Sequence, residues 1–213
     1  MTGDYAARVH GEEVPKERVD AFLRGGSATS PRGAGNCATS HNRPAAERQR
    51  RRWATQVVLI DELARRTCAK RGLPPPPEMQ PPATVPEADV ADLGSIIATA
   101  LAHSPAARAL LAALETEQRI PEEAVRDYYD RNRDRYLTPD ALRRGVDPYA
   151  PAAVPTDFLP YGHTRDGIER ELRQAAGRVA FFGWLDHART GVEYAPGHEH
   201  PGDPSHQDHE HRH

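Results

Sequence analysis

The chain of 213 residues has few cysteines, few aromatic side chains and no long apolar run. Its two cysteines, Cys37 and Cys68, are expected to be free thiols, because the first ten residues lack the apolar run of a signal peptide. No stretch approaches the roughly eighteen apolar residues that span a bilayer. These absences predict a cytoplasmic protein with no membrane partner.

An excess of charge of one sign is also lacking. The 28 basic and 31 acidic residues leave a formal net charge of −3, which gives no general field for a polyanion. Four arginines gather at 48–52, but they fall at a predicted helix start amid Glu47 and Gln49, with no second basic cluster nearby. We therefore expect no nucleic-acid partner.

Apolar residues are few but periodic, and 20 prolines and 16 glycines interrupt the pattern. Residues 5–14 predict a strand that turns at Gly11 and leads into a helix. The clearest amphipathic helix covers residues 47–71, where apolar residues recur at spacings of three and four. Two stretches, 24–46 and 74–88, are predicted to be loops or linkers because Gly, Ser and Pro replace the periodicity.

The second half of the chain is also helical in its pattern. We expect helical segments around 90–101, after Pro105, after Pro121 and after Thr164. The segment 138–163 contains five prolines and is predicted to be an irregular loop. The expected fold class is therefore mainly α.

A second short strand is expected at residues 191–195, close to the end of the chain. Strands at opposite ends of a chain can pair with each other, so we expect a short two-stranded ribbon that joins the N- and C-terminal parts. The predicted organisation is one helical domain over 1–195, followed by a flexible His-rich tail at 196–213.

Four stretches of the chain carry a family resemblance. They are ARVHGEEVPKERVDAFL, RRRWATQVVLIDELARRTCAKRGL, IPEEAVRDYYDRNRDRYLTP and GIERELRQAAGRVAFFGWLDHARTGVEY. In this order they resemble the opening strand and first helix, the long second helix, the helix before the isomerase domain, and the closing helix and strand of SurA/PrsA-type foldases. The resemblance implies a helical chaperone domain, like the N-terminal module of SurA, that binds a peptide or protein client.

In such foldases a parvulin prolyl isomerase domain lies between the last two stretches. Here about twenty-five Pro-rich residues separate Pro139 from Thr164, so the resemblance is to a module that lacks this domain, and prolyl isomerase activity is expected to be absent. The whole chain, tail included, is also similar to small actinobacterial proteins labelled malonyl-CoA:acyl carrier protein transacylases. The Gly-x-Ser-x-Gly motif that such chemistry needs is missing.

A chaperone module binds its client by burying apolar surface along a groove. The candidate client-binding residues are apolar side chains of the two long predicted helices. They are Trp53, Val57, Ile60, Phe181, Phe182 and Trp184. The sequence does not separate those that stay exposed from those that form the core.

The last residues, GHEHPGDPSHQDHEHRH at 197–213, contain six histidines and no apolar residue to bury. Neutral imidazole is a good ligand for Zn, Ni and Cu, so the tail is predicted to bind such a metal. The candidate ligands are His198, His200, His206, His209, His211 and His213. Ordering such a tail costs about 1–2 kcal/mol per fixed residue, so we expect modest affinity.

Two hypotheses about function follow. Recognisable catalytic motifs are missing, which favours a non-catalytic, chaperone-like client-binding protein with a metal-binding tail. The alternative is a metal-dependent enzyme or accessory factor of small-molecule biosynthesis, in which tail histidines complete a metal site together with His163 or His187. A closed site of this kind would bind about one ion tightly, whereas a buffer would bind several ions weakly.

Overall fold

The computed structural model describes residues 4–25, 43–74 and 85–203. The chain forms two compact units, where the sequence indicated one domain. Unit 1 comprises residues 1–110 and 183–213, and unit 2 comprises residues 111–182. The described residues are mainly helical, as expected, and a small antiparallel sheet completes unit 1.

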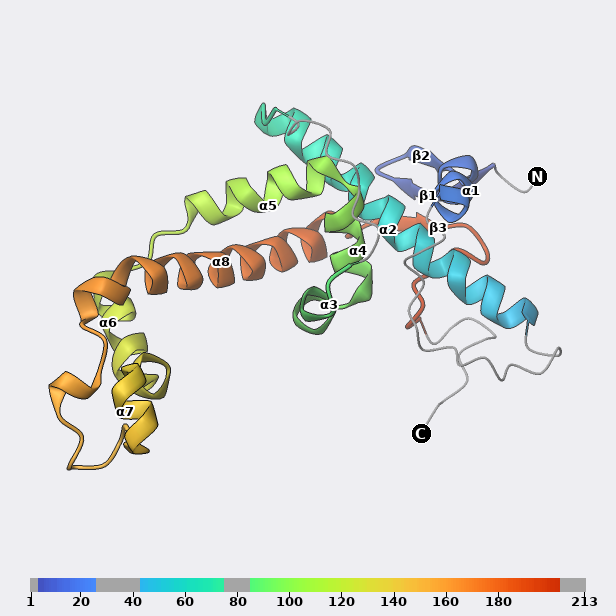
Figure 1. Cartoon of the computed structure of the whole chain (residues 1–213). Coiled ribbons are helices and arrows are strands. Elements are labelled where there is room, and N and C mark those ends of the chain that lie inside the picture. The colour runs from blue at the N-terminus through green and yellow to red at the C-terminus, as the bar shows by residue number, and fades with distance from the viewer. Residues whose placement is uncertain (1–3, 26–42, 75–84, 204–213) are drawn as a thin grey trace. The chain divides into compact units, whose positions relative to one another are not determined.

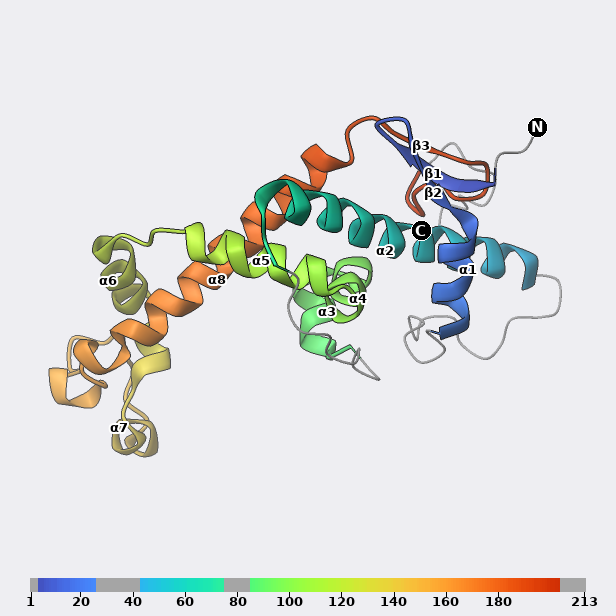
Figure 2. The same cartoon turned by 90° about the horizontal axis from the view of Figure 1, so that it is seen from above.

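The sheet of unit 1 joins the two ends of the chain. Its strands are β1 (Tyr5–Val9), β2 (Glu12–Pro15) and β3 (Val192–Tyr194), in the order β2-β1-β3. Both views of the molecule show β3 beside β1 (Figures 1 and 2). The expected pairing of the two ends is therefore confirmed, but the ribbon has three strands. The additional strand is β2, which follows the predicted turn at Gly11 and pairs with β1 as a hairpin.

The hairpin turn consists of His10 and Gly11, which have φ angles of 50° and 84°. Positive φ at both central residues is the geometry of a two-residue turn that matches the twist of the strands. The chain then enters helix α1 (Lys16–Gly25), whose Val19 is fully buried.

Helix α2 (Arg43–Arg71) is the element around which unit 1 is built, and it contacts α1, β1 and α4 (Ser95–His103) (Figure 1). Its apolar stripe was predicted from the sequence, and Ile60 and Ala64 on it are fully buried. The helix begins four residues before the predicted start at 47 and ends at the predicted residue. The glycine at 72, with φ of 63°, follows the last helical residue and permits the exit.

Two short helices, α3 (Glu87–Leu93) and α4 (Ser95–His103), replace the single segment predicted around 90–101. Gly94 separates them because its φ of 77° is outside the helical range. Helix α5 (Pro105–Glu117) begins at the predicted proline. Within the described residues no single helix is long and apolar enough to cross a membrane, although α4 and α5 together, bent by 104°, have the length and composition.

Unit 2 contains four complete elements, besides the end of α5 and most of α8 (Tyr161–Ala188). These are α6 (Glu122–Arg131), the 3-10 turns η2 (Arg133–Tyr136) and η3 (Pro155–Asp157), and α7 (Pro139–Arg144). Helix α8 (Tyr161–Ala188) supplies most of its length to unit 2 and its last turns to unit 1. Helix α7 and η3 lie in the segment 138–163, which was predicted to be an irregular loop.

The core of unit 2 is formed by two small clusters. In one, Val125 and Ile168 are buried, and tyrosines from α6, η2 and α8 pack around them. In the other, Leu137, Ala141 and Phe158 pack together, which gives the proline-rich segment a core of its own. This local core is why α7 forms although prolines surround it.

Candidate functional site

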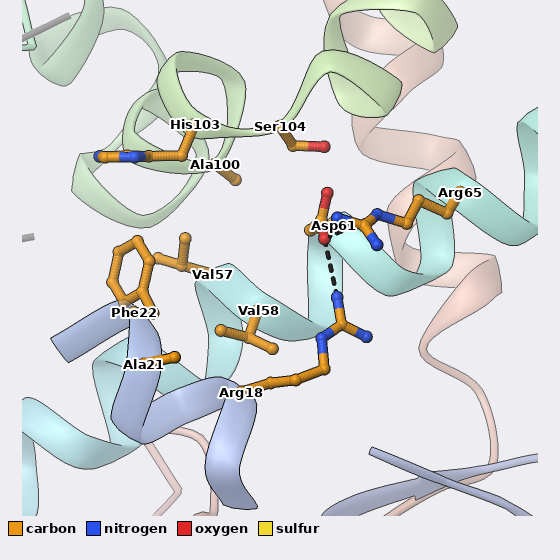
Figure 3. A pocket seen from close by; sticks show the side chains of 10 residues that line it. All are labelled: Arg18, Ala21, Phe22, Val57, Val58, Asp61, Arg65, Ala100, His103 and Ser104. Carbon is orange, nitrogen blue, oxygen red and sulfur yellow. Dashed lines mark hydrogen bonds and ion pairs between the residues drawn. The ribbon is translucent and has the colours of Figure 1, made fainter. Parts of the chain in front are cut away.

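A cavity of about 310 Å³ lies in unit 1 between α1, α2 and α4 (Figure 3). We call it the α1–α2–α4 cavity. Its apolar wall consists of Phe22 and Ala21 from α1, Val57 and Val58 from α2, and Ala100 from α4. Ligand pockets in proteins start at about 300 Å³, so this cavity has room for one small ligand or one large side chain.

The polar wall of the cavity is an ion-pair cluster centred on Asp61. One carboxylate oxygen, Oδ2, accepts a hydrogen bond from Arg18 Nη2 at 2.8 Å and forms an ion pair with Arg65 Nε at 3.0 Å. Figure 3 shows the two guanidinium groups converging on this carboxylate. Arg18 also binds Glu62 on α2, so the cluster fastens α1 to α2. The charges at the rim are therefore already paired within the protein.

His103 closes the cavity from the α4 side. Its ring meets the ring of Phe22 edge to face, with the centroids 5.3 Å apart. Burial, and then the charge of Arg108, lower the pKa of His103, so this imidazole is neutral near pH 7. Its Nε2 atom is buried and has no hydrogen-bond partner. Such an atom has lost its hydrogen bonds to water and has gained none within the protein. A polar group of a bound ligand would supply the missing hydrogen bond.

The carboxylate and the hydroxyl in the wall of the cavity already have partners within the protein. Asp61 is the one carboxylate among the ten lining residues, and two arginines hold it. The one hydroxyl, that of Ser104, accepts a hydrogen bond from the backbone N–H of Ala107 and caps the start of α5. No lining residue is paired with a second one as a nucleophile and base would be.

The six predicted client-binding residues divide into two groups. Val57, Ile60 and Phe181 are at most 2% exposed. Ile60 and Phe181 lie outside the lining of the α1–α2–α4 cavity, and partner elements cover them. Trp53, Phe182 and Trp184 are half-buried. Of the six, Val57 alone also lines the α1–α2–α4 cavity.

The partly exposed tryptophans each make a defined contact. The ring of Trp53 lies 5.9 Å from that of Phe22, next to the cavity. The indole nitrogen of Trp184 donates to Thr67 Oγ1 at 3.1 Å. The structure thus brings Trp53 close to the cavity and ties Trp184 to the C-terminal turns of α2.

The beginning of the predicted flexible tail is folded against α2. His198 is 4% exposed, which corrects the expectation that the tail has nothing to bury. Its neighbour Glu199 accepts a hydrogen bond from Arg52 Nε on α2 at 3.2 Å. Arg52, which the sequence placed at a predicted helix start, is itself buried.

The hydrogen bonds of His198 fix its tautomer. Thr55 directs its hydroxyl proton to the carbonyl of Arg51, 2.9 Å away. The Thr55 oxygen also lies 2.8 Å from His198 Nδ1, so Nδ1 is the donor of that bond. Burial, and then the charges of Arg51 and Lys16, lower the pKa of His198. Its imidazole is therefore neutral near pH 7, with the Nε2 lone pair available.

His200 is fixed in the opposite tautomer. Its Nδ1 accepts a hydrogen bond from the backbone N–H of Gly202 at 3.1 Å, so Nε2 carries the proton. Burial, and then the charge of Arg189, lower the pKa of this imidazole as well. The two histidines therefore offer different chemistry, an acceptor in His198 and a donor in His200.

The predicted metal ligands are only partly covered by the structure. His206, His209, His211 and His213 lie outside the described residues. Within residues 4–25, 43–74 and 85–203, no three His, Cys, Asp or Glu side chains form a group that would hold a metal ion. Metal binding by the tail therefore stays a prediction.

Sequence reasoning did not find the α1–α2–α4 cavity. Neither His103 nor Arg18 nor Asp61 was singled out from the sequence. These residues come from three helices, and nothing in a single sequence indicates that positions 18 and 103 face each other. A usable signal was the apolar pattern that placed Phe22 and Val57 on inward faces.

Comparison of the chain with protein-family models, with curated proteins and with solved structures finds no match.

Proposed function

We propose that this chain is a non-catalytic, chaperone-like protein that binds a peptide or protein client. In this proposal the α1–α2–α4 cavity receives an aromatic side chain of the client. The observation that carries the proposal is the composition of the cavity, in which an apolar wall that includes Phe22 adjoins a neutral His103 with an unpartnered nitrogen.

An aromatic side chain suits this cavity for two reasons. Its ring would pack against Phe22 and the valines of α2, where aromatic pairs add about 0.5–1.5 kcal/mol to simple burial. A polar tip such as a tyrosine hydroxyl would supply the partner that His103 Nε2 lacks. Charged side chains are less suitable because Arg18, Asp61 and Arg65 already satisfy one another.

The organisation of unit 1 agrees with the foldase resemblance in one respect. Both ends of the chain build this unit, and β1 pairs with β3 across a sequence separation of more than 180 residues. In the sequence the long helix α2 lies between the two paired strands, which is the order of elements that the resemblance implies. The segment between Pro139 and Thr164, where such foldases carry an isomerase domain, contains α7 and η3.

The test uses the full chain and an aggregating client. We expect the protein at equimolar ratio to delay the aggregation of a chemically unfolded model protein. The variant Ala21→Leu should lose this effect, because the exposed Ala21 lines the cavity and a larger side chain there fills it. The matched control is Asp20→Leu, an exposed position of the same helix outside the cavity lining.

A direct binding measurement identifies the client group. A short peptide with a central tyrosine should bind more tightly than the same peptide with alanine, measured by isothermal titration. The proposal fails if the full chain does not delay aggregation, or if Ala21→Leu acts as well as the unchanged protein.

The proposal includes metal binding by the tail, with Zn, Ni or Cu as the candidate ions. His198 supports it because its Nδ1–H is held by Thr55, and metal-ligating histidines usually donate their second nitrogen in this way. Such an arrangement orients the Nε2 lone pair before an ion arrives.

A further inference from the structure

A second cavity, of about 230 Å³, lies in unit 1 at the start of α4. It is lined by residues 93–97, where α3 ends and α4 begins, and by Arg189 and His200 from the C-terminal part of the chain. We call it the Arg189 cavity. None of its lining residues belongs to the α1–α2–α4 cavity.

Arg189 brings a positive charge without a counter-charge in contact. Within the described residues its guanidinium makes no hydrogen bond or ion pair, and its Nε atom is buried without a partner. Burial lowers the pKa of Arg189, but an arginine stays protonated in proteins. Asp186 and Tyr194 act on it electrostatically and do not bind it directly. The residue as a whole is partly exposed, but its Nε has lost its hydration, and an anion that binds the guanidinium would compensate this loss.

The start of α4 adds hydrogen-bond donors to the same cavity. The first intrahelical bond of α4 runs from Ala98 N to Gly94 O, so the N–H groups of Ser95, Ile96 and Ile97 precede it. No side chain caps this helix end. The partial positive charge of a helix N-terminus favours an anion at this position.

His200 contributes a third kind of donor. The hydrogen bond that its Nδ1 accepts from Gly202 leaves the proton on Nε2, so the neutral ring can donate. The charge of Asp203 raises the pKa of this imidazole, whereas the charge of Arg189 lowers it. The cavity therefore joins one guanidinium, one imidazole donor and the amides of a helix start.

We propose that the Arg189 cavity binds a small oxyanion, namely a carboxylate or phosphate group of a ligand. A guanidinium and backbone N–H groups are the donors that proteins use for such groups, and 230 Å³ accommodates a small anion or the anionic end of a larger molecule. The proposal is independent of client binding, because it uses a different cavity and different residues.

The experiment is a titration of the full chain followed by amide NMR spectra. Inorganic phosphate is added in the millimolar range at constant ionic strength, with sodium chloride as the balancing salt. We expect the amide signals of Ser95, Ile96 and Ile97 to shift and to saturate. A parallel titration with sodium acetate tests the carboxylate arm, and the arm with the lower saturating concentration identifies the source of the anionic group.

Two variants test the residues of the cavity. Arg189→Gln should weaken the response at least about tenfold, as expected when a charge-assisted hydrogen bond is lost. The control Arg170→Gln removes the same charge from an exposed position on α8, in unit 2, and should leave the titration unchanged. If Arg189→Gln does not fold, the location of the shifts in the unchanged protein still decides the question.

The proposal is overturned if neither phosphate nor acetate moves the signals of residues 95–97, or if the shifts are spread over the whole chain without saturation. It is also overturned if Arg189→Gln folds and responds like the unchanged protein. A saturating shift confined to the start of α4 supports it, whichever of the two anions produces it.

Discussion

His198 Nδ1 and Thr55 Oγ1 are 2.8 Å apart in the interior of unit 1, although 143 positions separate the two residues in the chain. The Thr55 hydroxyl donates a hydrogen bond to the carbonyl oxygen of Arg51, which fixes its orientation. His198 therefore donates to an oxygen that is itself held in place. This short chain of hydrogen bonds attaches the segment after β3 to helix α2. The segment from β3 to His198 is therefore part of the fold of unit 1.

The first prediction concerns this attachment. Thr55→Val removes the acceptor of His198 Nδ1–H and leaves a buried donor without a partner, which costs about 1–3 kcal/mol. We expect this loss in the free energy of unfolding, measured by urea denaturation. Proteolysis after Tyr194 should become faster.

Thr116 provides the control. Its hydroxyl makes the same bond to a carbonyl four residues earlier, that of Ala112 at 2.8 Å, but the residue is exposed and its hydroxyl holds no histidine. Thr116→Val should change the free energy of unfolding by less than about 0.5 kcal/mol, as surface substitutions usually do. Equal effects of the two variants would contradict the role given to Thr55.

The second prediction concerns the approach of α8 to α5 within unit 2. A Cβ atom at Gly177 would lie 2.9 Å from the backbone Cα of Glu115, closer than real Cβ contacts. Gly177→Ala should therefore lower the free energy of unfolding by about 1–3 kcal/mol, the usual cost of overpacking. Thermal or urea denaturation measures it.

The sign of the effect should reverse at Gly167, another glycine of α8 in unit 2. A Cβ atom there meets nothing within 4 Å, so Gly167→Ala gains helix propensity of up to about 1 kcal/mol without a clash. If both variants were stabilising, the close approach of the two helices would be wrong.

Much of unit 1 could be predicted because its signals are local. The apolar spacing of α2, the turn at Gly11 and the strand at 191–195 each depend on neighbouring residues alone. The buried state of His198 could not be predicted, since it depends on Thr55 from another part of the chain. The same reason applies to Ile60, whose apolar face is covered by partner elements and is not open to a client.

The segment 138–163 shows a different cause of error. Thr138 accepts a hydrogen bond from Ala141 N, Pro139 occupies the first turn, and Gly145 ends the helix with φ of 69°. These are ordinary start and stop signals, and they are present in the sequence. The irregular loop was predicted from the number of prolines, and these start and stop signals were not used. Prolines at the first turn of a helix support it, so position matters more than number.

The third prediction concerns pH. Burial and the charge of Arg108 lower the pKa of His103 in the folded protein. In the unfolded chain the same imidazole binds a proton at a pKa of about 6.5, so the unfolded chain is protonated first as the pH falls. The contribution of His103 to stability is complete above that pH and is lost as the pH falls toward the lower folded pKa. His198 and His200 act in the same direction. The free energy of unfolding should therefore fall between about pH 7.5 and pH 5.

His103→Phe separates this contribution from the others. The substitution keeps an aromatic ring against Phe22 and removes both the titration and the unpartnered Nε2. The slope of unfolding free energy against pH should become shallower, while stability near pH 7 is kept or raised. His163→Phe, at an exposed position, controls for the loss of one imidazole. An unchanged slope in His103→Phe would refute the assignment.

The last prediction distinguishes the two described histidines of the tail as metal ligands. His198 presents an Nε2 lone pair, because Thr55 holds its Nδ1–H, whereas His200 has its proton on Nε2 and its Nδ1 occupied by Gly202. A ligand nitrogen must be unprotonated, so His198 is ready to bind and His200 must first lose a hydrogen bond. In isothermal titration with Ni or Zn, His198→Gln should weaken the tightest site about tenfold or more, and His200→Gln should weaken it less.

Deletion of residues 204–213 should remove the remaining ions, because a single histidine does not complete a site. Several weak ions in the full chain would agree with a buffering tail, and one tight ion that survives the deletion would show that the ligands lie elsewhere.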